Sequence, residues 1–231
     1  AIEPEVKDLI NFLRKMGCNI KWTGQRTITI IGVQVLQNLK YKIMFDRIEA
    51  VTYMIASALT GGNLKITNIN PKIINTEINI LKRIGTKIKI KGNEINIVGK
   101  SKIKNIKLKT APYPGFPTDL QAQLMVLLCK ADGRSEISEK IFENRFMHAP
   151  ELNRMGAKIK IFGNKAIIEG NINFKAAELM ATDLRASVSL ILAALTAKGK
   201  SIINRIYHLD RGYEQIEKKL SNVGANIRRI S

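Results

Sequence analysis

The chain has 231 residues, 45% of them hydrophobic, which is enough for a substantial core in one large domain or two small ones. No apolar run reaches the roughly 18 residues of a membrane-spanning helix, so we expect no membrane partner. The formal net charge of +19 invites a nucleic-acid function.

Composition accounts for this charge in another way. Isoleucine occurs 36 times and asparagine 19 times, and lysine far outnumbers arginine. This joint excess is typical of drift towards A/T-rich codons, which places lysine at any solvated position. Aromatic residues make up only 6% and are not interleaved with the basic ones, so stacking platforms for single-stranded nucleic acid are not evident. We therefore do not expect nucleic acid as a partner.

The cysteines and histidines form no metal-binding or redox motif. Cys18 and Cys129 lack ligand spacing, and His148 and His208 are too few and too far apart in sequence for a zinc site. We interpret both cysteines as small core residues of a reducing compartment. Together with the lack of a signal peptide, this predicts a cytoplasmic protein. We expect no metal and no organic cofactor.

One unit repeats along the chain. Each full copy opens with an aspartate, runs into an apolar helix, and ends in a glycine followed by alternating strands. The glycines that mark the repeat, Gly17, Gly85, Gly156 and Gly224, are spaced 68, 71 and 68 residues apart. Units repeated at such a spacing bury their faces against one another. Three copies around a pseudo-threefold axis therefore predict one α/β domain of βαβαββ units.

The chain begins partway through a copy. Residues 1–33 hold only the second helix and the hairpin of a unit, which indicates the end of a preceding domain of the same build. We assign residues 1–43 to this first domain and residues 44–231 to the second. The first full copy starts at Asp46. It then predicts a helix end at Gly61-Gly62, a strand over 64–69, a helix over 73–84 and a hairpin over 87–91 and 94–98.

A polar excursion over residues 100–117 separates the first two full copies. It ends in APYPGFP, whose prolines restrict the backbone, and leads into a helix that starts near Asp119. The second copy then repeats the pattern, with its hairpin over 158–162 and 166–169. By local chemistry alone, Asp46, Asp119 and Asp183 are best explained as helix N-caps.

The third copy departs from the pattern. Its helix starts at Asp183, and residues 225–230 supply only one closing strand. In a closed threefold domain the missing strand must come from elsewhere. A segment N-terminal to this chain is the natural donor.

Four phrases are more than repeat landmarks: APYPGFPTDLQAQ (111–123), FENRFMHAPEL (142–152), MATDLRAS (180–187) and YHLDRGYEQIE (207–217). Each puts an arginine or a carboxylate at a helix start or in a loop that enters a helix. If the copies pack as predicted, Arg145, Arg185 and Arg211 form a cationic face with Asp119 and Asp183 among them. Arginine suits bidentate recognition of phosphate or carboxylate. Salt bridges between copies explain the same pattern equally well.

In this order the four phrases closely resemble the UDP-N-acetylglucosamine enolpyruvyl transferase family. The segments IEPEV, DRIE at Asp46 and RMGAKIKI fit it too, so the resemblance covers essentially the whole chain. It implies an inside-out α/β barrel of two domains, each built from three βαβαββ units, in which the N-terminal strand of the family completes the second domain. The chain resembles the C-terminal half.

The resemblance also implies an activity. Family members transfer enolpyruvate from phosphoenolpyruvate to the 3-hydroxyl of UDP-N-acetylglucosamine in peptidoglycan precursor synthesis, and release phosphate. By resemblance, Asp119 contacts that hydroxyl and is the candidate base, and Ile141 contacts the nucleotide sugar through its backbone. Arg185 and Arg211 would face phosphoenolpyruvate, with Asp183 beside the reacting carbons.

Two further arginines, Arg145 and Arg47, resemble anion-facing residues of the interdomain cleft, and Glu3 and Glu5 match acidic residues on the first-domain side. The catalytic cysteine loop of the family matches neither Cys18 nor Cys129, and it would lie N-terminal to this chain. We therefore expect the chain alone to be inactive, with the missing N-terminal part as its partner.

Three alternatives stay open. The related 5-enolpyruvylshikimate-3-phosphate synthase is similar in fold and chemistry, although FPTDLQAQ and ENRFMH argue against it. Related βαβαββ repeats occur in RNA-end-processing proteins, and the charge would suit RNA. The third is a non-catalytic remnant, against which speak the intact Asp119, Arg145, Asp183, Arg185 and Arg211.

Overall fold

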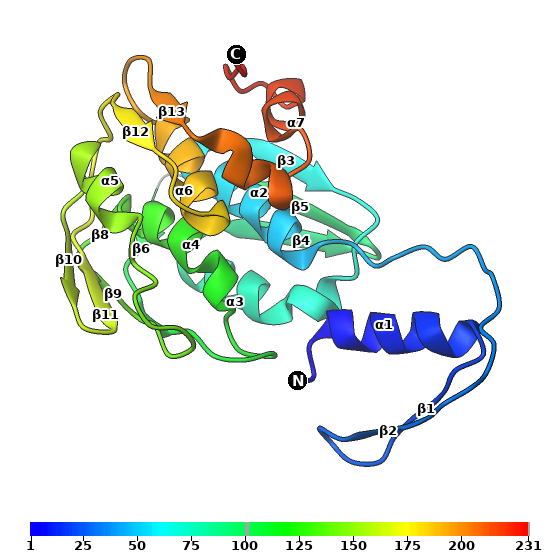
Figure 1. The fold of residues 1–231 in the computed structure, drawn as a ribbon. Helices are drawn as coiled ribbons and strands as arrows, with labels where there is room; N and C mark the ends of the chain where they lie inside the picture. The colour runs from blue at the N-terminus through cyan, green and yellow to red at the C-terminus, as the bar shows by residue number, and fades with distance from the viewer. Residues whose placement is uncertain (100–101, 231) are drawn as a thin grey trace.

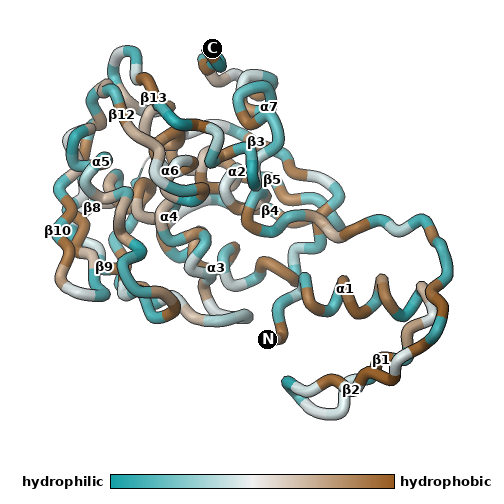
Figure 2. The backbone as a smooth tube through the Cα atoms, viewed as in Figure 1, coloured by the Kyte–Doolittle hydropathy of each residue, from teal (hydrophilic) through white to brown (hydrophobic). Residues whose placement is uncertain are grey.

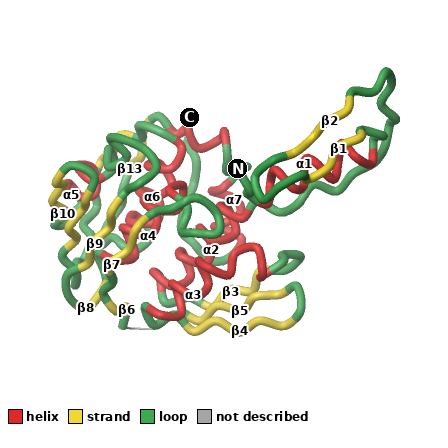
Figure 3. Tube along the Cα trace, turned by 90° about the horizontal axis from the view of Figure 1, so that it is seen from below, coloured by secondary structure: helices red, strands yellow, loops and turns green. Residues whose placement is uncertain are grey.

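A computed structural model describes residues 1–99 and 102–230 of the chain (Figure 1). Residues 1–43 form an arm that projects from a larger body, as Figure 3 shows most clearly. The arm holds helix α1 (Pro4–Lys15) and the antiparallel hairpin of β1 (Asn19–Trp22) with β2 (Ile28–Ile31). The helix and hairpin expected for the partial N-terminal copy are therefore confirmed.

Three helices that open the three full copies lie at the centre of the body: α2 (Arg47–Thr60), α4 (Gln121–Leu128) and α6 (Leu184–Ala194). All 8 residues of α4 are buried, as expected for a helix that is largely apolar on every side. Helix α4 packs against both α2 and α6. The sheets lie outside these helices (Figure 1), which confirms the predicted inside-out arrangement.

The first copy carries a three-stranded antiparallel sheet of order β3-β5-β4. Its elements are β3 (Asn63–Ile66), the short 3-10 helix η1 (Pro71–Ile74), α3 (Asn75–Arg83), β4 (Lys87–Lys91) and β5 (Glu94–Val98). The predicted hairpin matches β4 and β5 because strict alternation and a Gly92-Asn93 turn leave one register that buries Ile95 and Ile97.

The second copy forms a four-stranded sheet of order β10-β11-β9-β7. Its elements are β7 (Lys107–Lys109), β9 (Ser135–Ser138), α5 (Ala149–Arg154), β10 (Ile159–Phe162) and β11 (Lys165–Ile168). Strands β7 and β9 are parallel, with α4 between them in the chain. This gives a full βαβαββ unit.

The excursion over residues 100–117 is more ordered than expected. It contains β7 and also β6 (Ile103–Lys104), which pairs in parallel with β8 (Ala131–Asp132). The first strand of the second copy therefore comes from a stretch whose two- and three-residue strands are too short to show periodicity. Residues 100 and 101 lie outside the described residues.

The third copy holds the parallel pair β12 (Glu178–Met180) and β13 (Ile202–Asn204), the 3-10 helix η3 (Ile206–Arg211), and α7 (Ile216–Asn222). The closing strand expected over residues 225–230 is wrong, because these residues are in no strand. A strand is defined by hydrogen bonds to a neighbour, and the described residues offer this segment none.

The four marker glycines lie where helices end. Gly17, Gly85, Gly156 and Gly224 have φ angles of 103°, 108°, 93° and 98°. Glycine adopts this region without the steric cost of a side chain, which makes it the preferred residue after a helix C-terminus. The repeat spacing in the sequence is thus a spacing of helix ends.

Candidate active site

A cleft of about 820 Å³ lies between the arm and the body. The body contributes Arg47, Asp119 and Arg185 to its lining. From the arm and the connection that follows it come Glu5, Asp8, Leu9, Phe12, Tyr41 and Met44, among others. Five residues singled out in the sequence therefore meet at one hollow: Glu5, Asp46, Arg47, Asp119 and Arg185.

Asp119 is held between two arginines. Its Oδ1 accepts a hydrogen bond from Nη2 of Arg145 at 2.8 Å, and its Oδ2 accepts one from Nη2 of Arg185 at 3.0 Å. Asp119 lies in the 3-10 turn η2 (Thr118–Leu120), Arg145 in the loop before α5, and Arg185 in the first turn of α6. All three side chains are partly exposed, and Asp119 and Arg185 line the cleft, so a ligand there can reach these two.

The three aspartates at the starts of the copies differ in what their carboxylates do. Asp46 accepts hydrogen bonds from the amides of Ile48 and Glu49, and Asp183 accepts from those of Arg185 and Ala186. These two are N-caps, as predicted. The same prediction for Asp119 is wrong: its carboxylate caps no helix, because residue 119 lies inside the 3-10 turn and its oxygens face the arginines.

The guanidinium of Arg185 has a donor left over. Its carbon Cζ lies 5.9 Å from the ring centroid of Tyr213, and its Nη1 is buried with no hydrogen-bond partner in the part of the chain that the structure describes. Buried donors in folded proteins are almost always satisfied.

A buried polar cluster lies beneath Asp119 and Arg185, where α2, α4 and the segment after η3 meet. The hydroxyls of Thr52 and Tyr213 are 2.9 Å apart, and Nε2 of Gln123 lies 3.3 Å from each. The same Nε2 donates to the backbone oxygen of Asp119 at 3.0 Å. Burial raises the pKa of Tyr213, against the opposing effects of Thr52 and Arg185, so the phenol stays neutral.

Arg47 joins the body to the arm. Its Nε donates to Glu5 of α1 at 2.7 Å, and its Nη1 lies 3.8 Å from Glu77. Burial raises the pKa of Glu77, and its own backbone hydrogen bond and Arg47 oppose the rise. The ring centroid of Tyr113, in the proline-rich loop, lies 5.7 Å from Cζ of Arg47.

The structure brings the other predicted site residues less close together. Ile141 lies in the loop after β9, where its amide donates to Oε1 of Glu139 at 2.7 Å. Arg211 ends η3 and is exposed, and no described residue forms an ion pair with it. The predicted cationic face around Asp119 is thus formed by Arg145 and Arg185, without contact from Arg211.

His148, which its sequence context excludes as a zinc ligand, is a buried residue. It is 2% exposed and occupies the N-cap position of α5. Burial lowers its pKa to about 4, with the nearby Asp183 opposing this and Arg145 adding to it. Its Nε2 has no partner among the described residues. The imidazole is therefore neutral at pH 7.

Sequence reasoning also missed Gln123, Tyr213 and Glu139 as supporting residues. Each lies inside or beside one of the four phrases, and this position was the only signal available. Buried polar side chains whose partners lie on separate segments form no motif of fixed spacing, so the sequence does not show them as a group.

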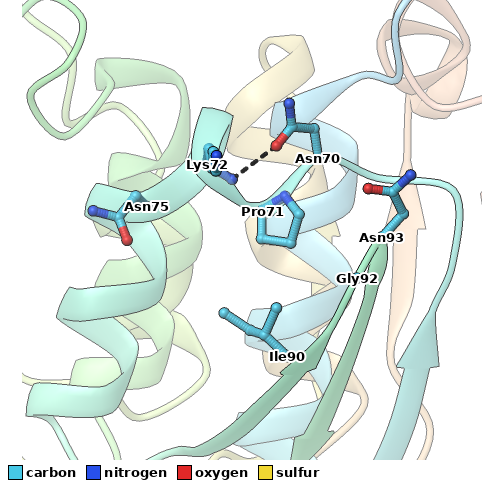
Figure 4. A pocket seen from close by; sticks show the side chains of 7 residues that line it. All are labelled: Asn70, Pro71, Lys72, Asn75, Ile90, Gly92 and Asn93. Atoms are coloured by element: carbon cyan, nitrogen blue, oxygen red, sulfur yellow. Dashed lines mark hydrogen bonds between the residues drawn. The ribbon is translucent and has the colours of Figure 1, made fainter.

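Other features of the described residues give no competing site. A second hollow of about 620 Å³ lies at the tip of the β4–β5 hairpin, between Asn70, Lys72, Asn75 and Asn93 (Figure 4). It contains none of the predicted site residues. Within residues 1–99 and 102–230, no group of three potential metal ligands is found, and no helix is long and apolar enough to cross a membrane.

Three copies with helices inside and sheets outside, and a carboxylate between arginines at a cleft, define an α/β protein of the enolpyruvyl transferase class. A model of the EPSP synthase (3-phosphoshikimate 1-carboxyvinyltransferase) family matches residues 1–220. The chain belongs to this family.

Curated relatives and solved structures agree with this assignment. The chain is 74% identical over its whole length to a UDP-N-acetylglucosamine 1-carboxyvinyltransferase from Pelagibacter ubique (strain HTCC1062), of which it covers 55%. It is 52% identical over 99% of its length to the enzyme of that name from Rickettsia prowazekii (strain Madrid E), of which it covers 54%. The chain thus spans about half the length of these relatives, and the predicted resemblance is confirmed.

Among solved structures, the enolpyruvyl transferase NikO from Streptomyces tendae is 30% identical, with a TM-score of 0.89 over 98% of this chain and 54% of NikO. An EPSP synthase from Acinetobacter baumannii is 21% identical, with a TM-score of 0.76 over 96% of this chain and 55% of that one. The second likeness shows the fold alone.

Proposed function

We propose that the chain is the C-terminal part of an enzyme that transfers enolpyruvate from phosphoenolpyruvate to the 3-hydroxyl of UDP-N-acetylglucosamine. The observation that carries this proposal is the carboxylate of Asp119, fixed in the cleft by Arg145 and Arg185. The names of the relatives support this substrate pair, because identity is 74% to a UDP-N-acetylglucosamine 1-carboxyvinyltransferase. A cytoplasmic location belongs to this proposal, because free cysteines are typical of a reducing compartment.

Each residue has a role in this proposal. Asp119 accepts the proton of the attacking sugar hydroxyl, and Ile141 holds the nucleotide sugar through its backbone. Arg185, which lines the cleft, and Arg211 bind phosphoenolpyruvate. Asp183 lies beside the reacting carbons. In the cleft, Arg145 and Arg47 complete the positive charge that stabilises a developing anion.

The arm supports the division into residues 1–43, the end of a first domain, and residues 44–231, the second. Figure 2 shows hydrophobic residues along the β1–β2 hairpin, which stands away from the body. Ile30, Ile31 and Val35 are 59%, 57% and 77% exposed. Such a surface is typical of a face that another segment covers. The remaining part of a first domain would cover it.

The experiment is phosphate release from phosphoenolpyruvate and UDP-N-acetylglucosamine, measured for this chain alone and with the corresponding N-terminal portion of a relative added. The proposal predicts release only from the mixture, because the acid and one wall of the cleft come from the added portion. Release from the chain alone would show that the essential acid lies within it. No release from a mixture of folded portions would remove the proposal.

A further inference from the structure

Glu139 is a buried carboxylate directly after β9, and its side chain bonds to both loops that carry proposed site residues. It is 2% exposed. Its Oε1 accepts from the hydroxyl of Thr110 at 2.7 Å and from the amides of Ile141 and Phe142 at 2.7 and 3.3 Å. Its Oε2 accepts from the hydroxyl of Thr118 at 2.8 Å.

The partners of Glu139 are two hydroxyls and two backbone amides, all of them neutral. A carboxylate buried without a cation is costly unless its oxygens are well bonded. A carboxylate accepts about four hydrogen bonds and donates none. The four donors around Glu139 match this capacity, and they come from separate segments of the chain. An apolar residue here would leave all four donors unsatisfied.

These bonds join the segments that form the candidate site. Thr118 directly precedes Asp119 in the 3-10 turn η2. The other loop carries Ile141 and, four residues on, Arg145, which bonds to Asp119 at 2.8 Å. Two sets of contacts therefore connect the loops. One is the partly exposed bond between Arg145 and Asp119, and the other is formed by the buried carboxylate of Glu139 with Thr118 and Ile141.

We propose that Glu139 is a positioning residue that sets the separation between Asp119 and the backbone of Ile141, and so determines how the nucleotide sugar fits. This inference rests on the function proposed above. Asp119 and Ile141 are both assigned to the nucleotide sugar, whereas Arg185 and Arg211 lie on α6 and η3, outside the connected loops. Loosening the connection should therefore affect one substrate more than the other.

Two pairs of variants distinguish the loss of the Glu139 hydrogen bonds from a general loss of stability. Glu139→Ala removes these bonds, whereas Glu139→Gln keeps an oxygen for the bonds at Oε1 and can donate its amide to Thr118, whose hydroxyl also accepts. Thr118→Val removes a single bond with little change of shape. Thr118→Ser restores the hydroxyl and serves as its matched control.

The first test uses the mixture of this chain with its N-terminal portion. In Glu139→Ala and Thr118→Val, KM for the nucleotide sugar should rise at least about tenfold, since small misplacements of binding groups have effects of this size. KM for phosphoenolpyruvate should change by less than about twofold, because Arg185 and Arg211 are held by α6 and η3 and, among the described residues, only the bond from Arg185 to Asp119 reaches the loosened loops. The Gln and Ser variants should stay close to wild type. An equal rise for both substrates, or no rise, would overturn the inference.

The second test uses this chain alone and measures hydrogen exchange of the Ile141 and Phe142 amides. Glu139→Ala should speed exchange at both by at least about tenfold, because the acceptor is gone; unchanged exchange would overturn the inference. If Glu139→Ala does not fold, Glu139→Asp replaces it, being too short to reach both loops. If the wild-type mixture is inactive, the proposed function fails while the exchange result still decides whether Glu139 holds the loop.

Discussion

The carboxylate of Asp119 and the guanidinium of Arg185 lie 3.0 Å apart although 66 residues separate them in the chain. One comes from the start of the second copy and the other from the start of the third. Packing of α4 against α6 at the pseudo-threefold centre brings these helix starts together. The fold therefore places the carboxylate that we propose as the base beside the guanidinium that we propose as an anion ligand, before any ligand arrives.

Asp46 caps a helix, so its substitution should lower the stability of the chain. Asp46→Ala should lower the free energy of unfolding by about 1 kcal/mol, because the amides of Ile48 and Glu49 lose their acceptor. Asp46→Asn, which can still cap, should cost clearly less. Urea unfolding of both variants measures this. Equal losses would show that charge, and not capping, explains the residue.

Tyr213 supports both members of the Asp119–Arg185 pair. Tyr213→Phe should destabilise the chain by about 1–3 kcal/mol, because Thr52 and Gln123 are left with a missing partner in a buried position. Tyr207→Phe is the matched control, since Tyr207 is 57% exposed and should change stability by less than about 0.5 kcal/mol. Chemical denaturation of the two variants decides. A Tyr213 variant as stable as the Tyr207 variant would contradict the assigned role.

His148 predicts a loss of stability in mild acid. Its pKa is lowered to about 4 in the folded chain, against about 6.5 when unfolded. The unfolded state therefore binds more protons between these values, and stability falls as pH drops through this window. Between pH 7 and 5 this group should account for about 2 kcal/mol.

The measurement is the free energy of unfolding at both pH values for wild type and His148→Gln. The variant should lose about 2 kcal/mol less than wild type on acidification. His208→Gln is the matched control. It should lose as much free energy of unfolding on acidification as wild type does, because His148 is still present. If wild type and His148→Gln respond alike, the imidazole is not buried as a neutral group.

The two cysteines should differ in reactivity. Cys129 is fully buried in the core, as expected, and burial raises its pKa to about 12. Cys18 is half-buried on the arm and belongs to no core cluster, so the expectation of a core residue is wrong there. Since the thiolate is the reactive form, a maleimide should modify only Cys18 in the folded chain and both residues after denaturation. Mass spectrometry of intact protein counts the labels, with Cys18→Ser as the control. Rapid modification of Cys129 in the folded Cys18→Ser variant would contradict its burial.

Local sequence signals predicted much of the fold. The helix starts at Asp46 and Asp183 and the hairpin of β4 and β5 are confirmed, because caps, alternation and a Gly-Asn turn act within a few residues. The segment over 225–230 failed as a strand because pairing depends on a neighbour that its own residues do not encode.

The candidate site was predictable only through resemblance. Asp119 stands in the same Thr-Asp-Leu triplet as Asp183, yet it bonds to arginines 26 and 66 residues away. No short pattern contains such partners. Glu139 and Tyr213 were missed for the same physical reason, since their partners come from separate copies or loops.

The central claim is that Asp119 is the base of an enolpyruvyl transfer. The most direct measurement is the turnover rate of the mixture of this chain with its N-terminal portion, for wild type, Asp119→Asn and the exposed control Asp132→Ala. Asp119→Asn should lower the rate about 10²- to 10⁴-fold, the usual contribution of a general base, whereas Asp132→Ala, at an exposed position, should keep the wild-type rate. A wild-type rate in Asp119→Asn would contradict it.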